Sequence, residues 1–319
     1  MNENEMKIFA GSSGKLFAER MCDYLNTKLG QSTTIKFSEG NIYVKIEETV
    51  RNKDVYLVQA VGLSPNEEFV EILFWIDAFK RASARSVTLV MPYFSYAKGD
   101  KKDEPIRARV RAECFELAGA DRVVPMDLRS PQIQGFFKKP VDHLFALPII
   151  CEYVKSLKIN DLVVVSPDTG FAKEARNYAR YLKLPVAIGD KIRTGHDENT
   201  IVVDIIGDVS GKNALIVDDF TISGNTLINV AAELKNRGAK RVFAALSHVL
   251  LNEKGVNNLE KSEIELLIST DTVNNPYLVN SQKVKIISAA PLFAEAVERI
   301  YNQESISLLF DIPRFVAKP

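Results

Sequence analysis

The stretch that decides the fold reads ALIVDDFTISGNT over residues 214–226, and LINVAAELKNRGA follows it over residues 227–239. The first part begins as an apolar run and ends in two acids, Asp218 and Asp219. The second part carries apolar residues at helical spacing. A short turn of small polar residues connects the two. We therefore predict a strand, a tight turn and a helix, which is the repeating unit of an α/β protein with a parallel sheet.

The same alternation of apolar runs and amphipathic segments extends over most of the chain. Runs rich in Val, Ile and Leu without alternation are typical of strands buried on both faces of a parallel sheet. The pattern runs to about residue 147 and starts again at Leu162. We predict an α/β fold with two doubly wound parallel-sheet domains, residues 1–147 and 148–319, with the C-terminal helix and tail able to pack back on the first. The expected helices are Lys15–Leu29, Asn66–Ala84, Arg109–Leu117, Phe171–Leu182, Thr226–Arg237 and Pro291–Asn302. The expected strands are Lys7–Ala10, Val55–Val61, Val87–Met91, Val123–Met126, Leu162–Ser166, Val186–Ile188, Ile201–Ile206, Ala214–Val217, Val242–Ser247, Leu266–Ser269 and Val284–Ile287.

The composition of the chain limits the classes of protein to which it can belong. The 319 residues suit two domains of ordinary size. Lysine plus arginine and aspartate plus glutamate both total 41, and a zero net charge argues against nucleic acid as the main partner. The three cysteines are far apart, the N-terminus MNENEMKIF has no signal-peptide pattern, and no apolar run is long enough to suggest a membrane span. We expect a cytoplasmic protein without a nucleic-acid or membrane partner.

The turn at residues 218–226 has the chemistry of a sugar-phosphate site. Backbone N–H groups at a helix start bind anions, and Gly224 lets the backbone approach a phosphate closely. Hydroxyl side chains add donors, and two carboxylates at the strand end can accept hydrogen bonds from a vicinal diol. An ordinary strand–helix turn with a Thr cap is the alternative reading. The expected ribose-5-phosphate-binding residues are Asp218, Asp219, Ser223, Gly224, Asn225 and Thr226.

This segment resembles the phosphoribosyl-diphosphate-binding loop that phosphoribosyltransferases and phosphoribosyl diphosphate synthases share, and by itself it does not choose between them. Other segments make the choice, and they follow one another in the right order. They are MPYFSYA at 91–97, AGADR at 118–122, MDL at 126–128, QIQGFF at 132–137, PVDHL at 140–144, VSPD at 165–168, DKIR at 190–193 and IGDV at 206–209. Over nearly its whole length the chain is similar to the ribose-phosphate pyrophosphokinases, the phosphoribosyl diphosphate synthases, and this similarity implies two domains of phosphoribosyltransferase type.

The resemblance implies an activity and a set of roles. The family transfers diphosphate from ATP to O1 of ribose 5-phosphate, requires Mg²⁺, serves nucleotide biosynthesis and forms homo-oligomers, dimers that stack into hexamers. Lys191 and Arg193 match the basic pair that stabilises the migrating diphosphate, which suits a transfer catalysed by positioning and charge. Asp168 matches a magnesium-linked aspartate. The positions matching ATP-binding residues are Phe37, Glu39, Asn41, Lys98 and Gly99.

Several of these positions depart from the family pattern. Arg129 stands where the family has a magnesium-binding histidine, and a guanidinium has no lone pair to offer a metal. The segment Lys98–Ile106 is shorter than its family counterpart. Further replacements are Asn41, Lys98-Gly99, Ile222, Asn225 and Val249. Two hypotheses follow: an active ATP:ribose-5-phosphate pyrophosphokinase, or a catalytically impaired paralogue that binds nucleotide or sugar phosphate and regulates a synthase. A phosphoribosyltransferase is a third reading, which the whole-chain resemblance disfavours.

Overall fold

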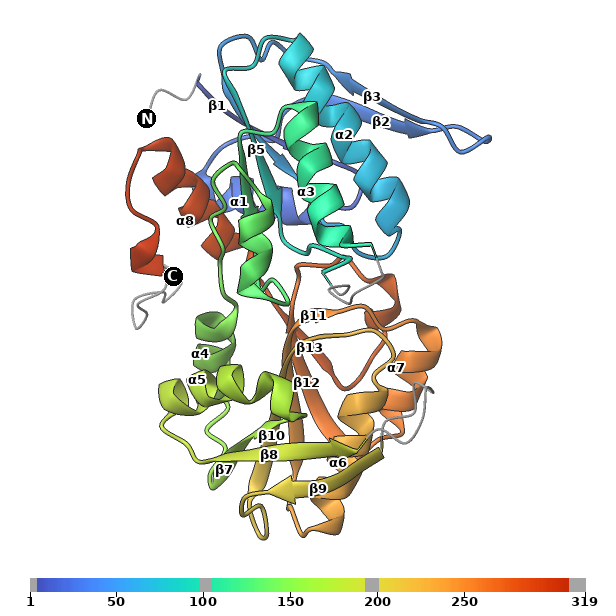
Figure 1. Cartoon of the computed structure of the whole chain (residues 1–319), viewed down its shortest axis with the longest axis vertical. Coiled ribbons are helices and arrows are strands. Elements are labelled where there is room, and N and C mark those ends of the chain that lie inside the picture. The colour runs from blue at the N-terminus through green and yellow to red at the C-terminus, as the bar shows by residue number, and fades with distance from the viewer. Residues whose placement is uncertain (1–4, 98–104, 193–200, 310–319) are drawn as a thin grey trace. The chain divides into compact units, whose positions relative to one another are not determined.

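The structure is a computed structural model that describes residues 5–97, 105–192 and 201–309, with only the backbone described at 191–192 and 201–203. The chain divides into two compact units (Figure 1). Unit 1 comprises the described residues of Met1–Phe145, Thr272–Asn274 and Ala289–Pro319. Unit 2 comprises those of Ala146–Asp271 and Asn275–Ser288. Within the described part of the chain, no helix is both long enough and apolar enough to cross a membrane.

Unit 1 is built on a parallel four-stranded sheet in the order β1-β4-β5-β6. Apolar side chains of these strands are buried on both faces, as the continuous apolar runs predict. The sheet residues Phe9 and Leu57 share one core with Trp75, Phe79 and Phe115 of the helices α2 and α3. The strands are β1 (Met6–Ala10), β4 (Asp54–Val58), β5 (Ser86–Met91) and β6 (Arg122–Pro125). The helices are α1 (Lys15–Leu25), α2 (Pro65–Arg81), α3 (Arg107–Ala118) and α8 (Ala290–Tyr301), with 3-10 turns η1 (Pro131–Phe136) and η4 (Ser307–Leu309).

The C-terminal helix α8 belongs to unit 1 and lies beside α1 (Figure 1). The Phe17 and Phe293 rings meet edge to face, with centroids 5.3 Å apart. Helix α1 ends four residues before the predicted Leu29, because Asn26 takes a left-handed conformation (φ 51°) that closes the helix.

Unit 2 is built on a seven-stranded sheet in the order β13-β12-β11-β10-β7-β8-β9. All neighbouring strands are parallel except β8 and β9, which are antiparallel. The strands are β7 (Leu162–Ser166), β8 (Val186–Ile192), β9 (Ile201–Ile206), β10 (Asn213–Thr221), β11 (Val242–Val249), β12 (Ile264–Thr270) and β13 (Val284–Ile287). The helices are α4 (Leu147–Ser156), α5 (Ala172–Leu182), α6 (Asn225–Asn236) and α7 (Glu253–Glu260), with 3-10 turns η2 (Thr169–Phe171) and η3 (Pro276–Leu278).

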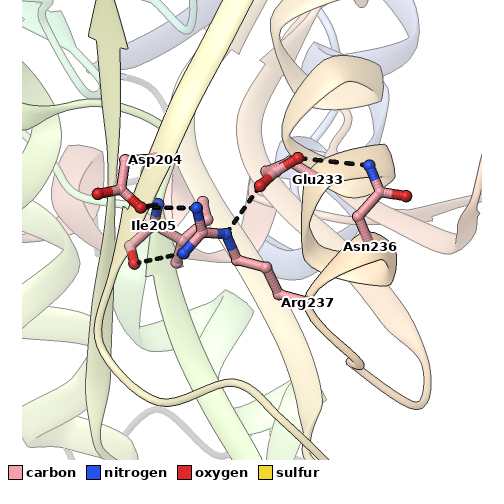
Figure 2. Close-up of polar contacts among 5 residues, drawn as sticks. All are labelled: Asp204, Ile205, Glu233, Asn236 and Arg237. Atoms are coloured by element: carbon pink, nitrogen blue, oxygen red, sulfur yellow. Dashed lines mark hydrogen bonds and ion pairs between the residues drawn. The ribbon is translucent and has the colours of Figure 1, made fainter.

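The end of α6 is tied to the edge strand β9 by Arg237 (Figure 2). Its guanidinium reaches Asp204 at 2.6 Å and Glu233 at 2.7 Å, and it donates to the Ile205 carbonyl at 3.3 Å. Glu233 also accepts a hydrogen bond from Asn236 at 3.3 Å. The antiparallel pair β8–β9 is therefore attached to the helix that begins at the predicted sugar-phosphate turn.

The mixed α/β fold with parallel sheets is confirmed, with two antiparallel exceptions. One exception is the pair β8–β9. The other is the separate hairpin of β2 (Ser32–Lys36) and β3 (Ile42–Ile46) in unit 1, which the sequence reading did not predict. Helices α4 and α7 were also not predicted.

Candidate active site

The predicted sugar-phosphate turn lies where the strand order of unit 2 reverses. β7 leads to β8 on one side, whereas β10 leads to β11 on the other. Ligands of open α/β sheets bind at such a reversal, beyond the carboxyl ends of the strands. β7 and β10 pair only as far as Val165 and Ile216. Asp168, Asp218 and Asp219 follow these two positions, so the fold brings all three acids to the same edge of the sheet.

The acids interact with the backbone and with one another. Asp218 accepts the Asp219 N–H at 3.0 Å, and Asp219, which is buried, accepts the Phe220 N–H at 2.9 Å. Burial raises the pKa of Asp218 well above its ordinary value, and the neighbouring charges of Asp219 and Asp168 raise it further. This concentration of negative charge favours a bound cation or hydroxyl donors of a ligand.

The turn between β10 and α6 depends on Gly224. This glycine caps the helix with φ 77° and ψ −14°, a conformation in which most residues are strained. A Cβ at this position would lie 3.2 Å from Cδ2 of Leu251. The Gly224 N–H donates to Oγ1 of Thr221 at 3.1 Å, and its carbonyl accepts the Ile228 N–H at 3.0 Å. Ser223 is exposed at the helix start, where backbone N–H groups favour an anion.

Asp168 is also a capping residue. Its carboxylate accepts the Phe171 N–H at 3.0 Å, and its backbone carbonyl accepts the Ser166 hydroxyl at 2.6 Å. These bonds fix the acid at the end of β7. Among the residues that the structure describes, no three His, Cys, Asp or Glu side chains form a complete metal-binding group. A Mg²⁺ ion in phosphate chemistry needs no such group, because it binds one or two carboxylates and completes its coordination shell with water and substrate phosphates.

In unit 1, the loop between β1 and α1 has its backbone donors occupied by side chains of the same unit. The Ser12 N–H donates to Glu71 at 2.8 Å, and the Ser13 N–H donates to Gln59 at 3.0 Å. Glu71 is buried and also accepts from Nε1 of Trp75 at 3.2 Å. Protein side chains thus take two backbone donors of this loop, so the turn of unit 2 is the better candidate for a sugar phosphate.

The predicted adenine-binding residues lie in unit 1, at the turn of the hairpin β2–β3. The Phe37 N–H donates to the Asn41 carbonyl at 2.9 Å, which closes the turn. Phe37 is 46% exposed, and its ring centroid lies 6.5 Å from that of Tyr43. The Asn41 side-chain amide donates to Glu39 at 3.3 Å. The hairpin therefore brings together the three residues that the family resemblance assigns to adenine binding, and the ring of Phe37 among them is partly exposed.

Arg129 lies on the loop after β6 and is exposed. The loop is held by His143, whose Nε2 accepts the Leu128 N–H at 2.9 Å, and by the Leu144 carbonyl, which accepts the Asp127 N–H at 3.0 Å. Burial lowers the pKa of His143 to about 4, so the imidazole is neutral and keeps the lone pair that this bond requires.

Four of the predicted site residues cannot be located fully. Lys98, Gly99 and Arg193 lie outside the described residues, and Lys191 is described only by its backbone at the end of β8. Sequence reasoning also missed two supporting groups. The Thr221 hydroxyl lies inside the quoted turn. Threonine hydroxyls in turns form hydrogen bonds with nearby backbone groups, so the residue type alone could have suggested that this oxygen accepts a backbone N–H. His143 lies inside the PVDHL segment, but nothing in that pattern reveals that its imidazole accepts the Leu128 N–H.

Comparisons with known proteins agree with this geometry. The family model for the N-terminal domain of ribose phosphate pyrophosphokinase matches residues 6–119, and the model for the phosphoribosyl synthetase-associated domain matches residues 197–311. The chain is 40% identical over 312 residues to a ribose-phosphate pyrophosphokinase of Bacillus caldolyticus, covering 97% of this chain and 99% of the relative. It is 42% identical over 313 residues to the enzyme of that name from Thermosipho africanus, covering 97% and 98%. The crystal structure of phosphoribosylpyrophosphate synthetase from Mycobacterium smegmatis superposes with a TM-score of 0.87 at 32% identity, over 94% of this chain and all of that one. This chain belongs to the ribose-phosphate pyrophosphokinase family.

Proposed function

We propose that the chain transfers diphosphate from ATP to O1 of ribose 5-phosphate and so forms phosphoribosyl diphosphate and AMP for nucleotide biosynthesis. The sugar O1 bonds to the β-phosphorus of ATP, the bond from that phosphorus to the oxygen of the α-phosphate breaks, and the O1 proton is released. The observation that carries the proposal is the acidic strand end and helix start at the strand-order reversal, in a chain about 40% identical over its length to proteins of this name. No comparison favours the impaired paralogue.

In this proposal the turn of unit 2 holds ribose 5-phosphate. The backbone donors and side chains of Ser223–Thr226 bind the 5-phosphate, and Asp218 and Asp219 accept from the sugar hydroxyls. Asp168 and its neighbouring acids fit a Mg²⁺ ion, which when bound neutralises charge on the transferring phosphoryl oxygens. Lys191 and Arg193 supply further positive charge to the migrating diphosphate.

In unit 1 we assign the adenine to Phe37, Glu39 and Asn41, and further ATP contacts to Lys98 and Gly99. Arg129 is not a metal ligand in this scheme, because a guanidinium offers no lone pair. Its fixed charge suits phosphate oxygens instead. The proposal also includes assembly into a homo-oligomer and a cytoplasmic location, which suit a biosynthetic enzyme that uses ATP.

The direct test is to incubate the purified protein with ATP, ribose 5-phosphate and Mg²⁺ and to measure AMP. We expect one AMP for each phosphoribosyl diphosphate, at rates within the usual enzyme range of about 1–1000 per second. Absence of AMP under varied Mg²⁺ and protein concentrations contradicts the proposal.

The sugar site has its own test. Asp218→Ala should weaken ribose 5-phosphate binding by about 1–3 kcal/mol, the cost of leaving a buried polar group of the complex without its hydrogen-bond partner. Calorimetry with ribose 5-phosphate measures this, and the exposed Asp23→Ala on α1 is the matched control. Equal affinity of the two variants contradicts the assignment.

A further inference from the structure

Asn275 is a buried residue of unit 2 that connects η3 to the loop between β11 and α7. It is 6% exposed. Its Nδ2 donates to two backbone carbonyls, that of Val249 at 3.2 Å and that of Leu251 at 2.9 Å. Its Oδ1 accepts the Tyr277 N–H at 3.0 Å and so caps η3. A side-chain amide has two N–H donors and one carbonyl acceptor, so both polar atoms of Asn275 have backbone partners.

The loop that this amide holds contacts the sugar-phosphate turn between β10 and α6 directly. The Leu250 N–H donates to the Thr221 carbonyl at 2.8 Å. Leu251 is fully buried, and its Cδ2 lies 3.2 Å from the position that a Cβ at Gly224 would take. The loop therefore supports the sugar-phosphate turn through one backbone hydrogen bond and one apolar side chain.

The same loop leads into α7, which also lies close to the sugar-phosphate turn. Asn252 caps this helix, because its Oδ1 accepts the Gly255 N–H at 2.9 Å. A Cβ at Gly255 would lie 3.3 Å from the Ser223 carbonyl oxygen. Helices α6 and α7 contact each other as well. The β11–α7 loop and the start of α7 therefore both pack against the turn.

The support matters because of the way in which such a turn binds phosphate. Its donors include backbone N–H groups, and a hydrogen bond weakens steeply when the donor is misaligned. The Leu251 carbonyl lies beyond the end of β11, where strand pairing no longer fixes the chain. Asn275 holds the loop at this carbonyl instead. A displacement of Leu251 opens space beside Gly224, and the donors of the turn lose their fixed directions.

We propose that Asn275 is a positioning residue for ribose 5-phosphate: it holds the β11–α7 loop, and the loop holds the sugar-phosphate turn in the conformation that binds the 5-phosphate. The inference rests on the proposed function, which assigns the 5-phosphate to this turn. Asn275 acts through Leu250 and Leu251 and not on the substrate itself. A carboxylate in place of its amide offers no donor to the two carbonyls.

The test compares Asn275→Asp with Asn213→Asp. Asn275→Asp keeps an oxygen that accepts the Tyr277 N–H but removes both bonds to the loop. Asn213 is the first residue of β10, at the opposite end of the strand from the turn, and its Nδ2 donates to the Asn160 carbonyl at 2.7 Å. We expect Asn275→Asp to raise the KM for ribose 5-phosphate about tenfold and to leave the KM for ATP within about twofold of the wild type. Asn213→Asp should leave both constants unchanged.

A second variant covers the case in which Asn275→Asp does not fold. Leu251→Val shortens the side chain that lies against Gly224 and leaves the backbone bonds of the loop in place. We expect a smaller selective rise in the KM for ribose 5-phosphate, about threefold. Leu267→Val is its control, because Leu267 is an equally buried leucine of the same unit, on β12. This control should leave both Michaelis constants unchanged.

An unchanged KM for ribose 5-phosphate in a folded Asn275→Asp overturns the inference, as does an equal rise in both Michaelis constants. If that variant does not fold, the same two outcomes in Leu251→Val overturn it. If the wild-type protein forms no AMP, the proposed function fails, and calorimetry with ribose 5-phosphate then decides the positioning role. A wild-type affinity that exceeds that of Asn275→Asp about tenfold, or that of Leu251→Val about threefold, supports the role, whereas equal affinities overturn it.

Discussion

At the scale of single residues, Gly224 combines a conformational and a functional requirement. Its φ of 77° and its distance to Leu251 make any side chain unfavourable. We expect Gly224→Ala to lower the free energy of unfolding by about 1–2 kcal/mol, the cost of a left-handed conformation for an L-residue, and to weaken ribose 5-phosphate binding. Urea unfolding and calorimetry measure the two effects.

The chain offers a matched control for this prediction. Gly211 has φ 68°, lies in the turn before β10, and has open space within 4 Å of the position that a Cβ would take. Gly211→Ala should cost similar stability but leave the affinity for ribose 5-phosphate unchanged. If both variants lose affinity equally, the loss reflects stability alone and Gly224 has no special place in the site.

His143 makes stability depend on pH. Its pKa falls from 6.5 in the unfolded chain to about 4 in the folded protein because burial disfavours the charged ring. Between these values the unfolded state binds more protons, so stability should decrease as pH falls from 6.5 towards 4, by about 2–3 kcal/mol at most. The contribution is fully present above pH 6.5.

The variant that tests this is His143→Gln, whose amide oxygen can still accept the Leu128 N–H. We expect the difference in unfolding free energy between wild type and variant to shift in favour of the variant as pH falls from 7 to 4. Urea unfolding at several pH values measures it. A difference that does not change with pH means that the imidazole does not titrate as its burial implies.

At the scale of elements, the sequence predicted what depends on local pattern. The strand β10, the turn at Gly224 and the helix α6 were predictable because an apolar run, a glycine and an amphipathic run follow one another directly in the sequence. The hairpin β2–β3 was not, because its strand STTIK (β2) has no apolar run, and the hairpin packs on α2 through its other strand, β3. Helix α7 was missed because its sequence EKGVNNLE contains poor helix formers. It forms because Asn252 caps the Gly255 N–H at 2.9 Å and the helix buries Val256 and Leu259.

The antiparallel edge strand β9, which the sequence predicted, is attached to a helix by a long-range contact. Arg237 joins β9 to α6 through Asp204, Ile205 and Glu233 (Figure 2). Exposed ion pairs contribute little to global stability, so Arg237→Ala should act locally. We expect faster backbone hydrogen exchange in β9 with little change in the unfolding midpoint.

Hydrogen exchange read by mass spectrometry measures this effect. Arg241→Ala is the control, because Arg241, which directly precedes β11, forms a similar exposed pair with Glu265 of β12. That variant should leave exchange in β9 unchanged. Equal exchange in β9 for the wild type and Arg237→Ala shows that strand pairing with β8 alone holds the edge strand.

At the scale of the whole molecule, the proposed homo-oligomer has a candidate surface in unit 1. In the hairpin β2–β3, which projects beyond α2 (Figure 1), Ile35 and Tyr43 are direct cross-strand partners. They are 42% and 44% exposed, and the ring of Phe37 lies close to that of Tyr43. An exposed apolar strip of this kind on a two-stranded ribbon favours contact with another protein surface.

We therefore predict that the protein is a homo-oligomer and that this strip contributes to its assembly. The double variant Ile35→Ser, Tyr43→Ser removes apolar area without touching the face that packs on α2, so the fold should persist while self-association weakens. Light scattering at micromolar concentration should give a multiple of 35.6 kDa for the wild type and a smaller average mass for the variant. Lys45→Ser, on the same outer face, removes charge instead of apolar area and should keep the wild-type mass. A monomeric wild type contradicts the oligomer, whereas an unchanged mass in the double variant places the subunit contact elsewhere on the chain.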